Sequence, residues 1–389
     1  IDGGGGFDRV TYWFRTDDNV TGGITVNMAT GTVVGDASVG TDTLRSVESV
    51  RATNFVDTYD ATGFTTSSTN AGSGGFIVIG GVQLAFNEFE GFGGNDSITG
   101  NGNTRIDYIN ATDGVTVNLL TGTAQGTASG DLANVGTDTI TGGVNSIQGS
   151  FYADTFYGSN NAPNTTESFD GGAGDDYIDG QGGFDLAFYN NAVGTVSGIN
   201  VDLAAGTVLG DFSIGADTLR SIESVRGTNF ADTYVATGYG QAGALNIGNS
   251  GTFNSFEGLA GNDIITGNGN TQLQFFNSTG GVTVNFGTGT VTGDASVGTD
   301  TFTGVNNVQG SNFNDTMIGA AGNQTFAGRG GADTFVYADS GGADIIADFN
   351  HAQGDQIDLT GVVGVYSLTD VQAIATPAGP NTLINFGGG

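Results

Sequence analysis

The sequence predicts an all-β fold, a parallel β-roll or β-helix solenoid built from Gly- and Asp-rich repeats, with a C-terminal capping segment. Three observations lead to this prediction. Repeats of fixed period run through most of the chain, short stretches inside each repeat alternate apolar and polar residues, and turn-forming residues are abundant. The 389 residues include 72 Gly but only 3 Pro and no Cys, so the turns rely on Gly and Asp rather than on Pro or disulfides.

One unit of about 38 residues occurs four times and sets the domain organisation. The first and third copies share the segment LRSVESVR or LRSIESVR, whereas GNDSITGNGNT or GNDIITGNGNT precedes the second and fourth. The chain is therefore a duplicated A-B pair, and we expect an A-B half at residues 1–177, an A′-B′ half at 178–329 and a C-terminal cap at 330–389. The four copies run over Gly22–Tyr59, Asp113–Phe156, Ser197–Tyr234 and Gly280–Met317.

Short runs within each unit have the two-residue period of a β-strand with one buried face, as in Ile24–Met28 and Val282–Phe286. No stretch keeps a 3.6-residue apolar period, so little helix is expected. Because such short strands bury their apolar faces against neighbouring copies, the fixed-period self-similarity favours a solenoid over a sandwich or a barrel.

The formal charge of −32 comes from 40 acidic and 8 basic residues and excludes some classes of partner. A nucleic acid is not expected to bind, because the charge has the wrong sign. No apolar run approaches the roughly 18 residues that span a bilayer. No signal peptide is visible, and Ile1 lies inside a repeat, so we expect the natural N-terminus further upstream. The 26 Phe and 11 Tyr disfavour disorder, so a compact fold with this charge needs cations to offset its self-repulsion.

The pattern that carries chemistry is the nonapeptide G-G-x-G-x-D-x-U-x, in which U is a large apolar residue. Its glycines let a six-residue turn curl until backbone carbonyls converge, and the Asp at the sixth position adds a carboxylate oxygen. Ca²⁺ takes six to eight such hard oxygens at about 2.3–2.6 Å. Two tandem copies, one further close copy and three looser copies lie at Gly171–Asp179, Gly180–Phe188, Gly3–Thr11, Gly91–Thr99, Gly258–Thr266 and Gly328–Val336.

These nonapeptides resemble the repeats of the RTX (repeat-in-toxin, hemolysin-type) calcium-binding β-roll family. The resemblance implies that each ion sits between the turns of successive coils, so that one turn provides only half of a site. The alternative is that the Asp side chains cap turns by Asx hydrogen bonds and bind no metal. The resemblance implies a best site in the tandem pair, with Gly171, Ala173, Asp175, Asp176, Gly180, Gly182 and Asp185, and further metal ligands at Asp8, Asp96, Asp263 and Asp333.

Two other series of Asp residues recur inside the 38-residue units. We expect these Asp residues to form turns, and metal binding is the less favoured alternative. One series comprises Asp42, Asp138, Asp217 and Asp300, and the other comprises Asp57, Asp154, Asp232 and Asp315.

The C-terminal segment carries a second resemblance, to the D-x-I-x-DF and G-x-D-x-IDL pattern that ends many proteins exported by type I secretion. This resemblance implies an uncleaved C-terminal export signal. The matching positions are Asp344, Asp348, Asp355 and Asp358.

No catalytic constellation is recognisable, and we expect no enzymatic activity. The single His351 rules out an HExxH zinc site and disfavours a Ser-His-Asp triad. No G-x-S-x-G nucleophile elbow occurs either. Recurring aromatic residues are interpreted as ladders stacked inside the solenoid, with a carbohydrate-contacting stripe as the alternative. They are Phe55, Phe151, Phe230 and Phe313 in the units, and Phe86, Phe89, Phe253 and Phe256 before the GND turns.

These features together predict a secreted, calcium-binding structural or adhesive protein of a bacterial cell surface or matrix, such as a segment of an S-layer, a filament or an adhesin. Ca²⁺ is the expected cofactor, and the chain is expected to fold, with possible self-assembly, when it binds Ca²⁺ outside the cell. The expected partners besides calcium ions are other copies of the chain or a cell-surface polysaccharide. The alternative is the C-terminal secretion and folding module of a larger RTX enzyme or toxin.

Overall fold

The computed structural model describes residues 1–13, 20–79, 81–163, 165–192, 194–338 and 342–385. This part of the chain is almost entirely β-structure, which confirms the predicted all-β solenoid class. The helix α1 (Leu368–Ile374) is short, and within the described ranges no helix is long and apolar enough to cross a membrane. The chain forms two compact units, unit 1 with residues 1–195, 206–223 and 246–250, and unit 2 with residues 196–205, 224–245 and 251–389.

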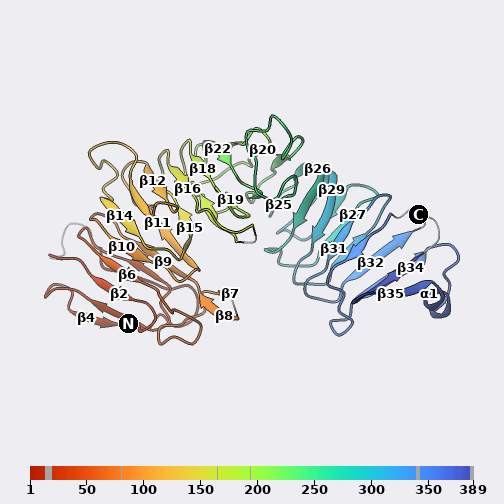
Figure 1. The fold of residues 1–389 in the computed structure, drawn as a ribbon, viewed down its shortest axis with the longest axis horizontal. Helices are drawn as coiled ribbons and strands as arrows, with labels where there is room; N and C mark the ends of the chain where they lie inside the picture. Colours follow the sequence, from red (N-terminus) through yellow and green to blue (C-terminus); the bar gives the residue numbers. More distant parts are fainter. Residues whose placement is uncertain (14–19, 80, 164, 193, 339–341, 386–389) are drawn as a thin grey trace. The chain divides into compact units, whose positions relative to one another are not determined.

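The strands of unit 1 lie side by side in two hydrogen-bonded ladders (Figure 1). The first ladder contains, in spatial order, β4 (Thr41–Thr43), β3 (Thr32–Val34), β2 (Thr25–Asn27), β6 (Thr58–Asp60), β10 (Ser97–Thr99), β14 (Thr137–Ile140), β13 (Thr123–Gly126), β12 (Val115–Asn118), β16 (Thr155–Tyr157), β18 (Tyr177–Asp179), β22 (Ala216–Arg220) and β21 (Thr207–Leu209). The second ladder contains β1 (Arg9–Thr11), β5 (Ser49–Arg51), β9 (Asn87–Glu90), β11 (Thr104–Asp107), β15 (Val144–Gln148), β17 (Ser168–Asp170) and β19 (Leu186–Phe188).

Unit 2 repeats this arrangement, and its long strands β26 and β29 run through both ladders. Its first ladder contains β20 (Asn200–Asp202), β24 (Thr233–Val235), β26 (Ile264–Gln274), β29 (Thr299–Gln309), β28 (Thr290–Thr292), β27 (Thr283–Asn285), β30 (Thr316–Ile318), β32 (Thr334–Ala338) and β34 (Gln356–Gly361). The second contains β23 (Ser224–Arg226), β25 (Asn254–Glu257), β26, β29, β31 (Thr325–Ala327) and β33 (Ile345–Ile346).

Most neighbouring strands run parallel, but the 38-residue units also insert reversed strands. In the first 38-residue repeat, β3 is antiparallel to both β2 and β4. The loop from β2 to β3 allows this reversal because Gly31 has φ 64° and the Asn27 side chain accepts a hydrogen bond from the Thr30 N–H at 3.0 Å. The strands β13 and β28 are reversed in the same way, so the solenoid departs from a purely parallel roll at these hairpins.

The two ladders of each unit enclose an apolar core. Short strands present one central side chain to the interior, such as Val26, which is fully buried. Tyr59 of the first ladder stacks on Phe89 of the second at a ring-centroid distance of 4.6 Å, and Tyr234 stacks on Phe256 at 4.7 Å in unit 2. Burial of each such side chain contributes about 1.5–3 kcal/mol to the free energy of folding. The core is therefore stabilised by many small contributions, with one central side chain from each short strand.

The interpretation of Phe55, Phe151, Phe230 and Phe313 as an internal ladder is wrong, because these side chains are 41, 50, 39 and 45% exposed. Each lies at the third or fourth position of a six-residue turn, where the chain has left the ladder and the side chain cannot reach the core. The interpretation is confirmed for Phe89 and Phe256, which are buried.

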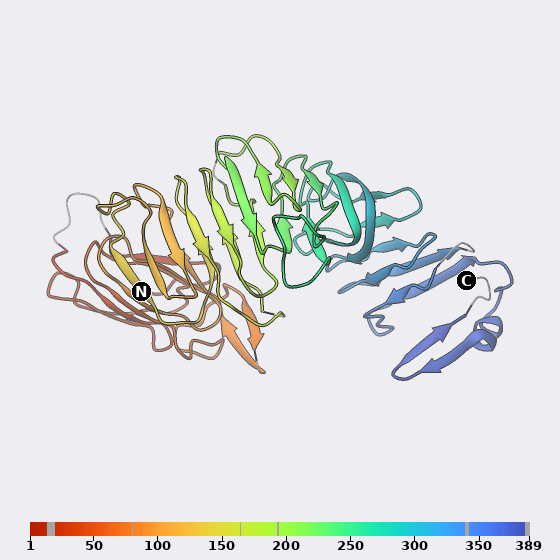
Figure 2. The ribbon, with the colours of Figure 1, turned by 45° about the horizontal axis from the view of Figure 1, so that its top comes forward.

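Two hairpins stand outside the ladders. The first, formed by β7 (Phe76–Ile79) and β8 (Val82–Ala85), projects from the ladders of unit 1 and exposes Phe76 and Val78 (Figure 2). The second, formed by β35 (Ala375–Ala378) and β36 (Asn381–Ile384), follows helix α1 in unit 2. His351 lies in an exposed turn before β34, as its position in the sequence predicts.

Candidate metal sites

Six Gly-rich turns share one backbone conformation, and each leads directly into a strand of a ladder. Their fourth residue is always Gly, with φ between 116° and 149°, and their second residue has φ between 60° and 92°. In four of the turns this second residue is not Gly. Because an L-residue in the left-handed region costs roughly 1–2 kcal/mol, the surrounding structure must impose this shape. We call these six the open turns; they comprise residues 3–8, 91–96, 171–176, 180–185, 258–263 and 328–333.

The sixth residue of every open turn is an Asp with one unpartnered carboxylate oxygen. Asp8 is half-buried, and the other five are at most 2% exposed. The Oδ2 atoms of all six are buried, and no donor among the described residues makes a hydrogen bond to any of them. A buried carboxylate oxygen without a partner is strongly unfavourable, so these oxygens are candidates for contact with a cation. The six residues are Asp8, Asp96, Asp176, Asp185, Asp263 and Asp333.

Glycine at the first position of the open turns makes room for this carboxylate. A Cβ atom placed on Gly171 would lie 2.1 Å from Oδ2 of Asp176, and one on Gly258 would lie 1.9 Å from Oδ2 of Asp263. Any other residue at the first position would therefore displace the carboxylate. Carboxylate oxygens such as these are the hard ligands that Ca²⁺ prefers, which makes the open turns the candidate metal sites of the chain.

A second set of six-residue turns places an Asp at the same sixth position but satisfies it internally. These closed turns have Ser or Thr at the second position. In residues 149–154, the Ser150 N–H donates to Oδ2 of Asp154 at 2.6 Å and the Ser150 hydroxyl donates to its Oδ1 at 2.9 Å. The closed turns comprise residues 52–57, 149–154, 227–232 and 310–315 and all have these two bonds, which confirms that their Asp residues form turns.

Hydrogen bonds between Asp residues connect open and closed turns in successive coils. The Asp154 N–H donates to Oδ1 of Asp176 at 2.8 Å, and the Asp176 N–H donates to Oδ1 of Asp217 at 3.0 Å. Asp176 therefore lies between two other buried Asp residues, one in the preceding coil and one in the following coil. The same three-residue series occurs as Asp57, Asp96 and Asp138, as Asp232, Asp263 and Asp300, and as Asp315, Asp333 and Asp355.

Burial makes the ionised form of these carboxylates unfavourable. Burial, and next the charge of Asp217, raise the pKa of Asp176 to about 10. Burial also raises the pKa of Asp96 and Asp263 to about 9 and that of Asp185 to about 8. In the closed turns, donated hydrogen bonds favour the anion and partly offset burial, so the pKa is about 7 for Asp154. The pKa of the less deeply buried open-turn Asp333 is also raised only to about 6. A bound cation would offset the same penalty in the open turns.

The two tandem turns of the predicted best site do not meet, because they lead into different ladders. Asp176 precedes β18 of the first ladder, whereas Asp185 precedes β19 of the second. The carboxylate of Asp185 instead accepts the Glu167 N–H at 3.1 Å, and its own N–H donates to Glu223 at 2.8 Å. Each tandem turn is thus hydrogen-bonded to residues of the preceding and following coils in its own ladder, and not to the other tandem turn.

The other predicted ligands of the tandem pair have separate places. Asp175 is exposed, and its Oδ1 accepts the Ala216 N–H of the following coil at 2.9 Å. Gly171 and Gly180 are the first residues of the cradles, where their missing side chains leave room for Asp176 and Asp185. The N–H groups of Ala173 and Gly182 bond to the carbonyls of Ser150 and Ser159.

The Asp residues that match the export pattern take part in the last coils of unit 2. Asp344 accepts the Gln324 N–H at 2.8 Å, and Asp355 accepts the Asp333 N–H at 3.1 Å. The carboxylate of Asp348 accepts the N–H groups of Gly328 and Arg329, both at 2.8 Å. The half-buried Asp358 accepts the N–H of the nearby Thr360 at 2.9 Å. Asp348 and Asp355 therefore support the final open turn, whereas Asp344 binds the preceding turn at Gln324.

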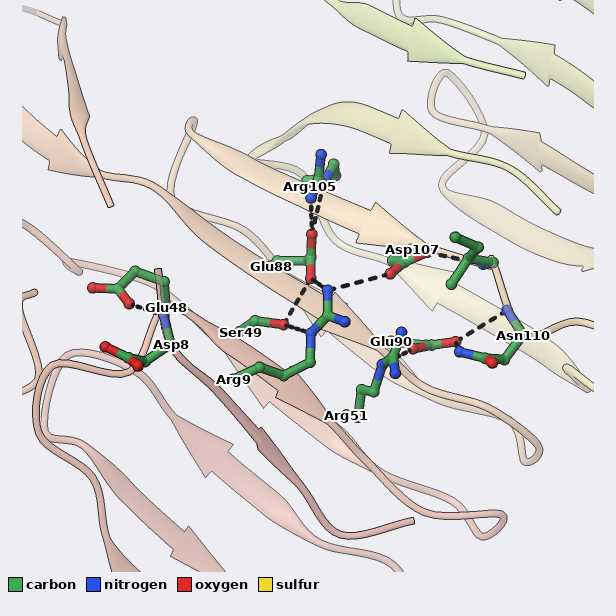
Figure 3. Close-up of polar contacts among 11 residues, drawn as sticks. Asp8, Arg9, Glu48, Ser49, Arg51, Glu88, Glu90, Arg105, Asp107 and Asn110 are labelled. Carbon is green, nitrogen blue, oxygen red and sulfur yellow. Dashed lines mark hydrogen bonds and ion pairs between the residues drawn. The ribbon is translucent and has the colours of Figure 1, made fainter. Parts of the chain in front are cut away.

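Arginines neutralise the buried glutamates of the second ladder. Glu88 is paired with Arg9 at 2.6 Å and with Arg105, while Arg51 pairs with Glu90 at 2.5 Å (Figure 3). Burial raises the pKa of Glu88, but the charges of Arg105 and Arg9 outweigh it and leave that pKa below its usual value. The chain thus supplies its own cations here, in contrast to the open turns.

Sequence reasoning missed Glu48 and Glu223, which accept the N–H groups of Asp8 and Asp185. It also missed the equivalence of closed and open turns, although the spacing of Ser or Thr four residues before Asp could have indicated it. Among the described residues, no three or more His, Cys, Asp or Glu side chains gather as a metal-binding group. Comparison with protein-family models finds no match for this chain, and comparison with curated proteins finds none either.

Proposed function

We propose that this chain is a secreted calcium-binding protein of the RTX β-roll type, with a structural or adhesive role at a bacterial cell surface or in its matrix. In this proposal Ca²⁺ binds at the six open turns and completes the fold outside the cell. The single observation that carries it is the set of six buried, unpartnered Oδ2 atoms held by one recurring turn conformation.

Calcium suits these turns better than other common cations. The donors are carboxylate and backbone oxygens in irregular, Gly-shaped loops, and Ca²⁺ tolerates such irregular oxygen shells whereas Mg²⁺ demands near-octahedral geometry. The chain contains no Cys and a single His, so softer metals find few of their preferred ligands.

Calcium binding would be coupled to folding. A site that exists only in the folded state stabilises it by RT ln(1 + [L]/Kd), which amounts to about 2.7 kcal/mol at a hundredfold excess over Kd. With a Kd of about 10⁻⁴–10⁻³ M, typical of extracellular calcium modules, the turns would be empty in the cytosol and filled outside. Six divalent ions would offset about a third of the formal charge of −32.

A structural or adhesive role, without catalysis, is proposed from the repeated architecture. Repeat solenoids bury their core between neighbouring coils and present extended surfaces, which suits contact with other copies or with a cell-surface polysaccharide. The export role of the C-terminal segment is part of the proposal. The second candidate is a secretion and folding module of a larger RTX enzyme or toxin, and the placement of Asp344, Asp348 and Asp355 in the last coils supports either role.

The test is circular dichroism combined with light scattering while Ca²⁺ is titrated from excess EGTA to about 10 mM, well above the expected Kd. The proposal predicts a cooperative gain of β-structure as Ca²⁺ is added. Growth in particle size with the transition would support a self-assembling structural protein, whereas the same transition without growth would favour the module of a larger protein. Full β-structure and unchanged thermal stability in EGTA would overturn the calcium proposal.

A further inference from the structure

The open turn at residues 3–8 lies against a second acidic turn, the one that contains Glu48. The Asp8 N–H donates to Oε2 of Glu48 at 2.9 Å. The A′ segment repeats this contact, since the Asp185 N–H donates to Oε2 of Glu223 at 2.8 Å. The glutamates follow Ser46 and Ser221, which have positive φ of 49° and 52°, so the two A segments build the same pair of turns.

The two pairs differ in how the second glutamate oxygen is satisfied. In the A′ segment, Oε1 of Glu223 accepts the Asn249 N–H at 2.6 Å. In the A segment, Oε1 of Glu48 is buried and accepts no hydrogen bond within the described part of the chain, and the same holds for Oδ2 of Asp8. Glu48 is only 2% exposed, so the first pair contains two unpartnered carboxylate oxygens where the second contains one.

A glycine-rich segment covers the Glu48 carboxylate. A Cβ atom on Gly72 would lie 1.8 Å from Oε1 of Glu48, and one on Gly74 would lie 2.5 Å from its Cγ. The segment is held in place by Ser73, whose hydroxyl accepts the Gly6 N–H at 2.7 Å and donates to the Gly6 carbonyl at 3.1 Å. The Gly72–Gly74 segment is thus hydrogen-bonded, through Ser73, to the open turn that contains Asp8.

Among the arginines that the structure describes, none forms an ion pair with Asp8 or Glu48. The side chain of Arg9, the residue next to Asp8, is directed to Glu88 and Ser49 instead (Figure 3). Figure 3 also shows the carboxylates of Asp8 and Glu48 close to one another at the edge of the Arg9–Glu88 network.

We propose that Asp8 and Glu48 together form a calcium site beneath the Gly72–Gly74 segment. In the counterpart at Asp185, both oxygens of Glu223 already accept backbone N–H groups, so Glu223 is not a ligand there. This inference rests on the proposed calcium binding and adds Glu48 as a ligand from outside the nonapeptides. Glu48 therefore contributes to one site only, the one that contains Asp8.

The experiment counts the calcium ions bound per full chain by equilibrium dialysis in Glu48→Gln, Asp8→Asn, the double variant and Glu223→Gln. We expect Glu48→Gln and Asp8→Asn each to lose the same single ion and the double variant to lose no more than one. Glu223→Gln is the matched control and should keep the full number.

An undiminished number of ions in Glu48→Gln, with affinity unchanged, would overturn this inference while leaving calcium binding at the open turns intact. A loss of two ions in the double variant would also overturn it, since Asp8 and Glu48 would then serve separate sites. If the unaltered chain binds no calcium, the proposed function fails together with this inference. Near-UV circular dichroism of each variant in Ca²⁺ checks that the fold is kept.

Discussion

The open turn at residues 171–176 and the closed turn at residues 149–154 lie in successive coils and both place an Asp at the sixth position. In the closed turn, Ser150 donates both its N–H and its hydroxyl to the carboxylate of Asp154. In the open turn, Gly172 takes the place of Ser150 with φ 86°, and Oδ2 of Asp176 has no donor among the described residues. The difference teaches that the residue at the second position of the turn decides whether the chain itself donates hydrogen bonds to both oxygens of the buried carboxylate or leaves its Oδ2 without a donor.

The largest expected effect is on the pH dependence of stability without calcium. The buried Asp176 has a folded-state pKa of about 10 and Asp96 and Asp263 of about 9, whereas an unfolded Asp has a pKa near 3.9. Folding therefore takes up protons, and this stability is present in full below about pH 4 and lost as the pH rises through these folded-state values.

We accordingly expect thermal melts in calcium-depleted buffers to show a loss on the order of several kcal/mol between pH 5 and pH 9. The window starts at pH 5 because ion pairs such as Arg105–Glu88, in which the pKa of Glu88 is lowered, weaken in stronger acid. In saturating Ca²⁺ the same range should be nearly flat. Stability that rises with pH in calcium-depleted buffer would contradict the assignment of these Asp residues as buried and unpartnered.

A smaller effect should separate the two kinds of turn directly. Without calcium, Asp176 must take up a proton on folding, because its folded-state pKa is raised, whereas Asn needs none. We therefore expect Asp176→Asn to raise the free energy of unfolding in EGTA at neutral pH by about 2–3 kcal/mol and to remove a similar amount of calcium-linked stabilisation. Asp154→Asn removes acceptors for the Ser150 and Val115 N–H groups. It should therefore destabilise by about 2–3 kcal/mol with or without Ca²⁺.

Urea denaturation of both variants in EGTA and in Ca²⁺ measures this contrast. The decisive feature is that the free energy of unfolding in EGTA changes with opposite sign in the two variants. If Asp176 only stabilised its turn by hydrogen bonds, Asp176→Asn would lower this free energy as Asp154→Asn does. Equal losses for the two variants under both conditions would show that open and closed turns do not differ in the way described.

The smallest expected effect concerns the second position of the turns. Leu259 has φ 65° in an open turn, so Leu259→Gly should leave the free energy of unfolding unchanged or raise it by up to about 1 kcal/mol. In the closed turn at residues 227–232, the N–H and hydroxyl of Thr228 donate to Asp232. Thr228→Gly should therefore lower the free energy of unfolding by about 1–2 kcal/mol. Thermal denaturation in Ca²⁺ measures both, and a larger loss for Leu259→Gly would contradict the assignment of backbone strain.

Much of this arrangement could be predicted from sequence, because Gly, Asp and alternating apolar residues act locally. The all-β solenoid and the placement of a buried Asp at the end of each Gly-rich turn follow from such local rules, as at Asp96 and Asp263. The nonapeptide spacing also identified the six open-turn Asp residues that have an unpartnered oxygen, although Asp217 and Asp344, outside the nonapeptides, have one as well.

The remaining features depend on how coils stack. A nonapeptide forms one turn and one strand, which is half of a coil, so the consecutive turns of Asp176 and Asp185 enter different ladders although they adjoin in sequence. The contact of Glu48 with Asp8 joins residues 40 positions apart, and no local pattern signals it. The exposure of Phe55 follows from its place within a turn, which periodicity alone does not determine.

The most direct test of the central claim is a crystal structure of the chain grown in Ca²⁺, with anomalous scattering used to locate the ions. The account predicts anomalous peaks within about 2.3–2.6 Å of Oδ2 of Asp8, Asp96, Asp176, Asp185, Asp263 and Asp333, as expected of calcium ligands, and none at Asp57, Asp154, Asp232 or Asp315. Open turns without peaks in saturating Ca²⁺, or peaks at the closed turns, would contradict it.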